Sequence, residues 1–276
     1  MRGTSERMSQ LLLDKPQQPY DAQTYWTSYY KAQLHGQPSD WITIGAGTEV
    51  EGRFHYNATE NSIIRALLRR EPVAGTAAAV WRFAQQRRGR RLLDIGSGSG
   101  HWIDFFRNIF LVAEAVGVEI APQMVDYLRR KYAGNPAVHI HSLDISEPSL
   151  TLGHDRFDFI SAIGVMFHIV DDGRWHQAIK NLASMLKPDG ILIVGGEFGA
   201  ETRNVQVHVS DHFEAWGGET LMSATQLRVN KRVRSLAKWH KVATDSGLVI
   251  ADLIRTERES GIATPENDIL VLVAAA

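Results

Sequence analysis

The chain has 276 residues, of which 44% are hydrophobic and 22% are charged, and its formal net charge is −1. This composition is typical of globular proteins and excludes bulk disorder, and the charge provides no global field that would draw the protein to nucleic acid or to a membrane. The absence of cysteine excludes disulfides, thiolate metal sites and thiol catalysis.

The length allows one large domain or one domain with an appendage. We expect residues 1–20, which are polar and contain two prolines, to form a flexible leader. No apolar run approaches the roughly 20 residues of a membrane helix, and the amino-terminal residues lack the apolar core of a secretory signal. A cytoplasmic protein without membrane insertion is therefore expected.

Residues 21–88 are predicted to form a helical cap segment. Four rings recur at the spacing of one face of a short helix: Tyr25, Trp26, Tyr29 and Tyr30. These rings either cover a core or form a lid over a ligand pocket, because Tyr and Trp combine apolar surface with a polar tip. In the second interpretation, Tyr29 and Tyr56 contact substrate.

Two further helices are predicted within this segment. Asn57 and Glu60 have the spacing of a capping box, so a helix is expected to begin there, and Pro72 is expected to end it. A second helix is expected over residues 76–86.

From residue 89 onward, short apolar runs alternate with amphipathic segments. Seven runs have the length of strands: 92–95, 115–120, 138–143, 157–163, 191–196, 248–254 and 269–273. Helices are expected near 102–110, 122–132, 175–186 and 231–246. The alternation predicts an α/β fold with a doubly wound, seven-stranded, mostly parallel sheet over residues 89–276. No helix pattern separates the last two runs, which favours an antiparallel last strand.

A glycine-rich turn follows the first predicted strand. Gly96, Gly98 and Gly100 allow a tight turn and a close approach to a ligand. The dinucleotide fingerprint needs a glycine where this chain has His101, and a phosphate-binding Walker loop needs a lysine that is missing here, so the spacing disfavours both ligands. Glu119 ends the next strand, where a carboxylate can accept hydrogen bonds from both hydroxyls of a ribose; the alternative is an ordinary strand-end acid.

With these motifs in order, the sequence resembles the class I S-adenosylmethionine-dependent methyltransferases over about residues 90–275. The resemblance is carried by five stretches: L-D-I-G-S-G-S-G (93–100), V-G-V-E-I (116–120), L-D-I (143–145), F-D-F-I (157–160) and L-K-P-D-G-I-L-I-V (186–194). It implies a Rossmann-like methyltransferase domain with S-adenosylmethionine as the cofactor.

The resemblance also implies which residues bind that cofactor. The glycine turn would hold the methionine part, with Asp94 beneath it. Glu119 would hold the ribose, and Asp144 would read the adenine amino group. The implied set is Asp94, Gly96, Ser97, Gly98, Gly100, Glu119, Ile120, Asp144, Ile145 and Ile163.

Two residues near the ends of the fourth and fifth strands are catalytic candidates. Histidine side chains ordinarily titrate near neutral pH, so His168 is a candidate general base for a hydroxyl acceptor, with a role as pocket wall as the alternative. Glu197 is a candidate for orienting substrate, and otherwise a solvated or capping carboxylate. Orientation matters because alignment of donor and acceptor can contribute about 7–11 kcal/mol.

Residues 198–230 are predicted to form a cap insertion, because long connections are usually functional or disordered. Val205, Val207 and Val209 alternate in this insertion as in a strand, and His208 and His212 are candidate substrate contacts. The alternation argues against the continuous helix that a metal site on these two histidines would need, so no metal is expected.

The expected function is methyl transfer to a small, partly apolar metabolite, with O-methylation favoured. A C- or N-methyltransferase of a lipid, isoprenoid or natural product remains an alternative, as does a non-catalytic cofactor-binding scaffold. The basic stretches 87–91 and 228–241 are interpreted as solvated faces, so a nucleic-acid partner is not expected. A homo-oligomer is left open.

Overall fold

The computed structural model describes residues 21–33, 38–44, 48–68, 85–86, 88–148, 150, 152, 156–199, 205–209, 229–255 and 268–275. The predicted leader, Pro72, most of the helix expected over 76–86, and His212 lie outside these residues. None of the described helices combines the length and the hydrophobicity needed to cross a membrane.

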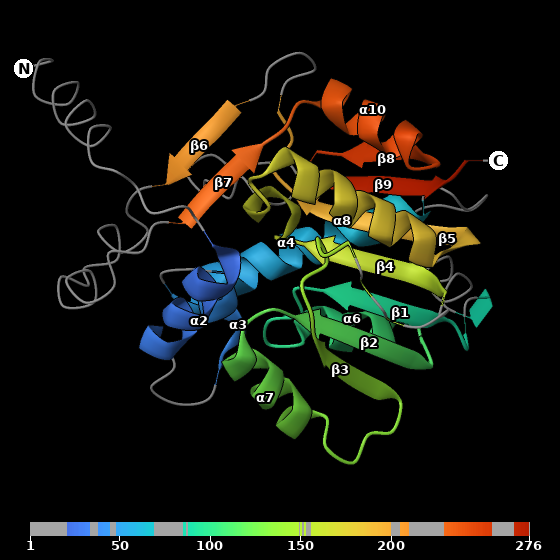
Figure 1. Ribbon diagram of the computed structural model, residues 1–276. Helices are drawn as coiled ribbons and strands as arrows, with labels where there is room; N and C mark the ends of the chain where they lie inside the picture. The colour runs from blue at the N-terminus through green and yellow to red at the C-terminus, as the bar shows by residue number, and fades with distance from the viewer. Residues whose placement is uncertain are drawn as a thin grey trace, which may run out of the picture.

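A seven-stranded sheet forms the centre of the fold (Figure 1), in the order β3-β2-β1-β4-β5-β9-β8. The five parallel strands are β1 (Arg91–Ile95), β2 (Glu114–Glu119), β3 (Val138–Ser142), β4 (Phe157–Ile163) and β5 (Leu186–Gly196). Strand β9 (Asp268–Ala274) is antiparallel to both of its neighbours, β5 and β8 (Leu248–Ile254). The predicted mostly parallel sheet with an antiparallel last strand is confirmed.

The strand order places a ligand site at one edge of the sheet. The chain runs from β1 outward to β2 and β3, then returns to β4 on the other side of β1. Leu92 of β1 therefore pairs with Ala115 on one side and with Phe159 on the other. Such a reversal opens a crevice at the carboxyl ends of the strands, where open α/β sheets bind ligands.

Alternate residues of the strands supply two apolar layers. Leu92 and Val271 pack with α4 (Glu49–Leu68) and α6 (His101–Ile109) on one face. Leu93 and Leu270 pack with α8 (Asp172–Met185) and α10 (Leu236–Asp245) on the other. Figure 1 shows α8 and α10 in front of the sheet. The side-chain period of two along each strand is the reason that both faces are apolar.

Among the described residues before the sheet, we call three helices the cap helices: α2 (Ala22–Gln33), α3 (Asp40–Thr43) and α4. Helix α2 packs on α7 (Pro122–Lys131), where Tyr25, Tyr29 and Tyr30 form a buried cluster with Ala121 and Met124. Figure 1 shows α2 and α3 beyond the carboxyl ends of the central strands, between α4 and α7.

The predicted start of the helix at Asn57 is wrong, because α4 begins at Glu49. The Thr48 hydroxyl accepts a hydrogen bond from the backbone N–H of Glu51 at 3.2 Å, as a helix-capping residue does. Thr48 and Glu51 have the spacing of the Thr-x-x-Glu capping box, so the true start carried a local signal. Asn57 lies inside the helix instead.

The insertion after β5 contains a two-stranded hairpin of β6 (Val205–Val209) and β7 (Val229–Val233). The alternating valines thus form a strand, in agreement with the expectation that this stretch is not a continuous helix. The helix expected from residue 231 begins only at Leu236, because β7 occupies the preceding residues and the Ser235 side chain caps the helix by accepting from the N–H of Lys238.

Candidate cofactor and active site

A cavity of about 210 Å³ opens at the carboxyl ends of β1, β2 and β4, between the sheet and the cap helices. Eleven of the predicted site residues line it: Tyr29, Tyr56, Gly96, Ser97, Gly98, Glu119, Ile120, Asp144, Ile145, Ile163 and His168. The cavity therefore joins the glycine turn, the acid of β2 and the aromatic cap residues in one site.

The glycine turn needs residues without a side chain. Gly96, Gly98 and Gly100 have φ of 66°, 51° and 84°, in the left-handed region that favours glycine. A Cβ atom at Gly96 would overlap the side chain of Val165, and one at Gly98 would lie 3.3 Å from Cβ of Thr43. Gly100 caps α6 and does not line the cavity.

Glu119 joins the end of β2 to this turn. Its carboxylate accepts hydrogen bonds from the backbone N–H groups of Gly98 at 3.0 Å, Ile120 at 2.8 Å and Ala121 at 2.9 Å. Burial raises the pKa of Glu119, and the three N–H donors oppose that shift. The cavity thus has a fixed acceptor at the place expected to bind a ribose.

Asp94 lies fully buried beneath the turn. Its Oδ1 accepts from the hydroxyl of Ser161 at 2.6 Å, whereas Oδ2 has no hydrogen-bond partner among the described residues. Burial raises the pKa of Asp94 to about 7. A buried acceptor without a donor costs free energy, so this oxygen suits a cationic or hydrogen-bond-donating group bound above the turn.

Asp144, which also lines the cavity, is held by a residue that the sequence does not predict. Arg174, in the first turn of α8, donates to Oδ2 of Asp144 at 2.6 Å, and Ser146 donates to Oδ1 from its N–H and its hydroxyl. Arg174 also lines the cavity. It follows Asp144 by 30 residues in the chain, and no local pattern links the two.

His168 lies in the short 3-10 helix η1 (Met166–His168) and is 9% exposed. Its ring contacts Trp26 of α2 edge-on, with centroids 5.1 Å apart, and Phe167 at 4.4 Å. The histidine therefore forms part of the cavity wall on the side of the cap helices, and Trp26 is a second residue that the predicted site omitted.

Glu197, the second catalytic candidate, is not among the residues that line this cavity. Glu197 lines a second, smaller cavity with Phe167 and Arg234, so the structure does not bring it to the site of His168. His208 lies in β6, and His212 lies outside the described residues. In the part of the chain that the structure describes, no three side chains are grouped as metal ligands.

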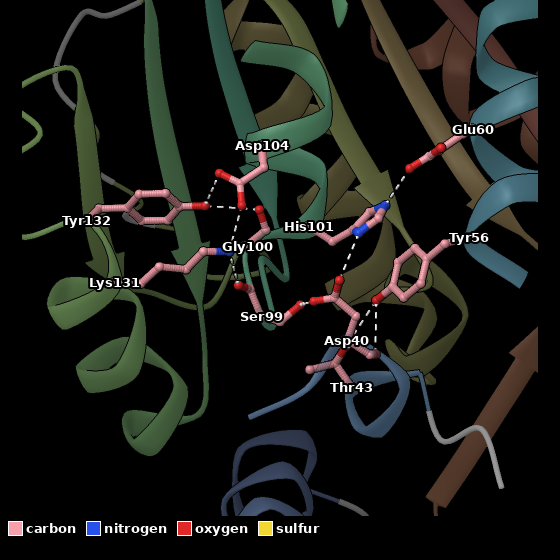
Figure 2. A network of polar contacts seen from close by, with 10 residues as sticks. All are labelled: Asp40, Thr43, Tyr56, Glu60, Ser99, Gly100, His101, Asp104, Lys131 and Tyr132. Carbon is pink, nitrogen blue, oxygen red and sulfur yellow. Dashed lines mark hydrogen bonds and ion pairs between the residues drawn. The ribbon is translucent and has the colours of Figure 1, made fainter. Parts of the chain in front are cut away.

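A polar network, shown in Figure 2, connects the glycine turn to the cap helices. Asp40 of α3 accepts from the hydroxyl of Ser99 at 2.5 Å and lies 3.1 Å from Nδ1 of His101. Nε2 of His101 lies 2.8 Å from the Glu60 carboxylate of α4. The sequence reasoning noted His101 only as a missing glycine, and it missed both acidic partners.

Comparison with known proteins supports the class suggested by this geometry. Residues 68–248, more than half of the chain, match the sequence model of a family described as "Methyltransferase domain". The solved structure of the CcbJ methyltransferase from Streptomyces caelestis is 19% identical, with a TM-score of 0.57, and the match covers 93% of this chain and 100% of that one.

Two curated proteins match shorter stretches. The tRNA U34 carboxymethyltransferase of Syntrophotalea carbinolica is 34% identical over 113 residues, which cover 38% of this chain and 32% of that protein. Nodulation protein S of Bradyrhizobium diazoefficiens is 29% identical over 103 residues, which cover 37% of this chain and 47% of that protein. The chain thus matches less than half the length of either relative.

The fold and the glycine-turn site define a class I methyltransferase with a Rossmann-like sheet. The chain belongs to the methyltransferase-domain family, as residues 68–248 show. S-adenosylmethionine is the cofactor of this class, and the residues present fit it: Gly96, Ser97 and Gly98 of the turn line the cavity, and the Oδ2 of Asp94, which has no hydrogen-bond partner among the described residues, suits the cationic methionine end.

The buried Asp94 leads to a prediction on stability. Its folded-state pKa of about 7 lies above the ordinary 3.8, so the folded chain binds more protons than the unfolded chain between these values, and stability falls as pH rises through this window. Asp94→Asn stays neutral and retains an acceptor for Ser161. We expect it to stabilise the cofactor-free chain at about pH 8 but not at about pH 4.

Urea unfolding of wild type and Asp94→Asn at both pH values measures this effect. The surface variant Asp189→Asn serves as the control, since 63% of that side chain is exposed. An Asp94→Asn gain that is equal at both pH values would show that Asp94 does not titrate in this range.

Proposed function

We propose that the chain transfers the methyl group of S-adenosylmethionine to a small, partly apolar acceptor, with a hydroxyl oxygen as the favoured acceptor atom. The observation that carries the proposal is that eight of the ten predicted cofactor residues, all but Asp94 and Gly100, line one cavity with the aromatic cap residues. Tyr29, Tyr56 and Trp26 supply apolar surface beside the glycine turn, which suits a small molecule with an apolar part.

When bound, the cofactor supplies a methyl group already activated on its sulfonium. The residues then have three tasks. Glu119 accepts hydrogen bonds from the ribose, and Asp94 accepts from the amino end, so the donor is held in one orientation. Rings of the cap helices exclude water from the cavity. His168, in the wall beside Trp26, accepts the proton that a hydroxyl acceptor loses.

The role of His168 is testable by substitution. His168→Ala is expected to lower kcat by about 10²- to 10⁴-fold, the contribution typical of a general base, while the Kd for S-adenosylmethionine changes little. The expected pattern is a strongly slowed production of S-adenosylhomocysteine, with calorimetric binding of S-adenosylmethionine retained. His141→Ala is a suitable control, because His141 lies on β3 and does not line the cavity. Normal turnover in His168→Ala would show that His168 is not the general base and only forms part of the cavity wall.

The tRNA carboxymethyltransferase relative favours a second candidate, in which the acceptor is a nucleic acid. A C- or N-methyltransferase and a non-catalytic binding scaffold also remain open. Incubation with labelled S-adenosylmethionine and a panel of phenols, amines, lipids and tRNA, followed by detection of S-adenosylhomocysteine, separates these candidates. Turnover with tRNA alone would refute the small-molecule proposal, and binding without turnover on any acceptor would favour the scaffold.

A further inference from the structure

We infer that His101 is a positioning residue which, as a doubly hydrogen-bonded imidazolium, holds the cap helices against the cofactor-binding turn. The inference rests on the proposed function, because it assigns a role in cofactor binding. It concerns the three residues that we call the clamp: Asp40, Glu60 and His101.

The clamp joins parts of the chain that are far apart in sequence. His101 begins α6, directly after the glycine turn, whereas Asp40 and Glu60 belong to α3 and α4. The two ring nitrogens of His101 face one carboxylate each, at 3.1 and 2.8 Å. Figure 2 shows the ring lying between the two acids.

The protonation state follows from these partners. A carboxylate can only accept a hydrogen bond, so both ring nitrogens have to donate, and only the imidazolium has two N–H groups. Burial lowers the pKa of His101, but the hydrogen bonds and charges of Asp40 and Glu60 outweigh burial and raise it above 6.5. The positive end of the α6 dipole also opposes the charge, and the two acids offset it.

The clamp also fixes the turn itself. The second carboxylate oxygen of Asp40 accepts from Ser99, which lies within the turn. Thr43, one helical turn after Asp40, donates to the Asp40 carbonyl at 2.7 Å and packs against Gly98. The Tyr56 ring covers His101 at 3.8 Å between centroids. Movement of α3 would therefore disturb Ser99 and Gly98 directly.

Other titratable groups surround the clamp on each side. Tyr56 and His55 lie on α4, and Asp94 lies beneath the turn on β1. Asp104 follows on α6 and pairs with Lys131 of α7 at 2.7 Å, and Lys131 also donates to the Ser99 carbonyl at 2.8 Å. Tyr132 donates to the Gly100 carbonyl and to Asp104. Because Lys131 and Asp104 neutralise each other, the acids of the clamp dominate the charge at His101.

Loss of the His101 proton has a defined consequence. Neutral imidazole donates from one nitrogen only, so one carboxylate loses its donor and faces a lone pair instead. The folded-state pKa is raised, and the stabilisation is therefore present at low pH and lost as pH rises through that pKa. Cofactor affinity is expected to fall with it, because the cap helices and the turn line the same cavity.

The experiment is calorimetric titration of the full chain with S-adenosylmethionine between about pH 6 and pH 9. We expect the wild-type Kd to rise by about tenfold over this range. His101→Gln, which cannot titrate, is expected to bind weakly at all pH values with no such rise. In Glu60→Gln, the neutral side chain no longer stabilises the imidazolium of His101. The rise in Kd is therefore expected at lower pH. His139→Gln on the exposed part of β3 should behave as wild type.

A second measurement does not depend on the cofactor. Hydrogen exchange of amides in residues 41–43 and 49–60, corrected for chemical exchange, is expected to lose more protection with rising pH in wild type than in His101→Gln, in which Asp94 still titrates. A pH dependence that persists unchanged in His101→Gln would overturn the inference. If exchange shows the pH-dependent loss but S-adenosylmethionine does not bind, the clamp stands and the proposed function fails.

Discussion

Replacement of Glu119 by alanine is expected to raise the Kd for S-adenosylmethionine by about 100-fold, equivalent to about 3 kcal/mol. A hydrogen bond to a charged group contributes about 1.5–3 kcal/mol, and a ribose offers two hydroxyl donors. The variant also removes the acceptor for the N–H of Gly98, so the turn that carries the methionine end loses its tie to β2.

Calorimetric titration measures this effect, with Glu114→Ala as the matched control. Glu114 begins the same strand, at the end away from the cavity, and pairs with Arg91 at 3.0 Å. Its loss is expected to leave cofactor affinity unchanged, because a partly exposed ion pair contributes only about 0–1 kcal/mol to stability. An affinity in Glu119→Ala equal to that of the control would contradict the ribose assignment.

Gly96→Ala is expected to give the second large effect, a loss of about 2–4 kcal/mol of unfolding free energy together with at least tenfold weaker cofactor binding. The left-handed φ of 66° costs a residue with a side chain about 1–2 kcal/mol. The new Cβ would also overlap the side chain of Val165, which lies just after β4. Either the glycine turn or the segment after β4 therefore has to move. Either movement alters the wall of the cavity.

Gly134→Ala separates these two costs. Gly134 has a similar φ of 81°, but a Cβ there meets no atom within 4 Å. This variant should therefore lose only the backbone cost of about 1–2 kcal/mol and bind S-adenosylmethionine as wild type. Chemical unfolding and calorimetry of both variants test the comparison. Equal losses in both would mean that the contact with Val165 is unimportant.

Much of the central domain could be predicted from local patterns. The alternation of apolar runs with amphipathic segments determines the strands, because a parallel strand buried on both faces has to be apolar throughout. The glycine turn and Glu119 could be found because each directly follows such a run, and the carboxyl ends of neighbouring parallel strands meet at one edge. These are properties of short stretches, and the sequence contains them completely.

Other predictions failed for local reasons. Asn57 has the residue type and spacing of a capping residue, but it lies inside α4, because Thr48 already caps the start of that helix. Lys231 belongs to an amphipathic stretch, but pairing with Val207 places it in a strand, since a hairpin partner overrides a weak helical pattern.

The sequence by itself determined the sheet, the glycine turn and the family of the chain. Tertiary structure alone decided which distant side chains meet: Arg174 at Asp144, Trp26 at His168, and both acids of the clamp at His101. It also decided that Glu197 lines a different cavity. The physical reason is that hydrogen bonds and ring contacts between separate elements depend on how those elements pack. No periodic pattern in the sequence indicates which elements will pack together.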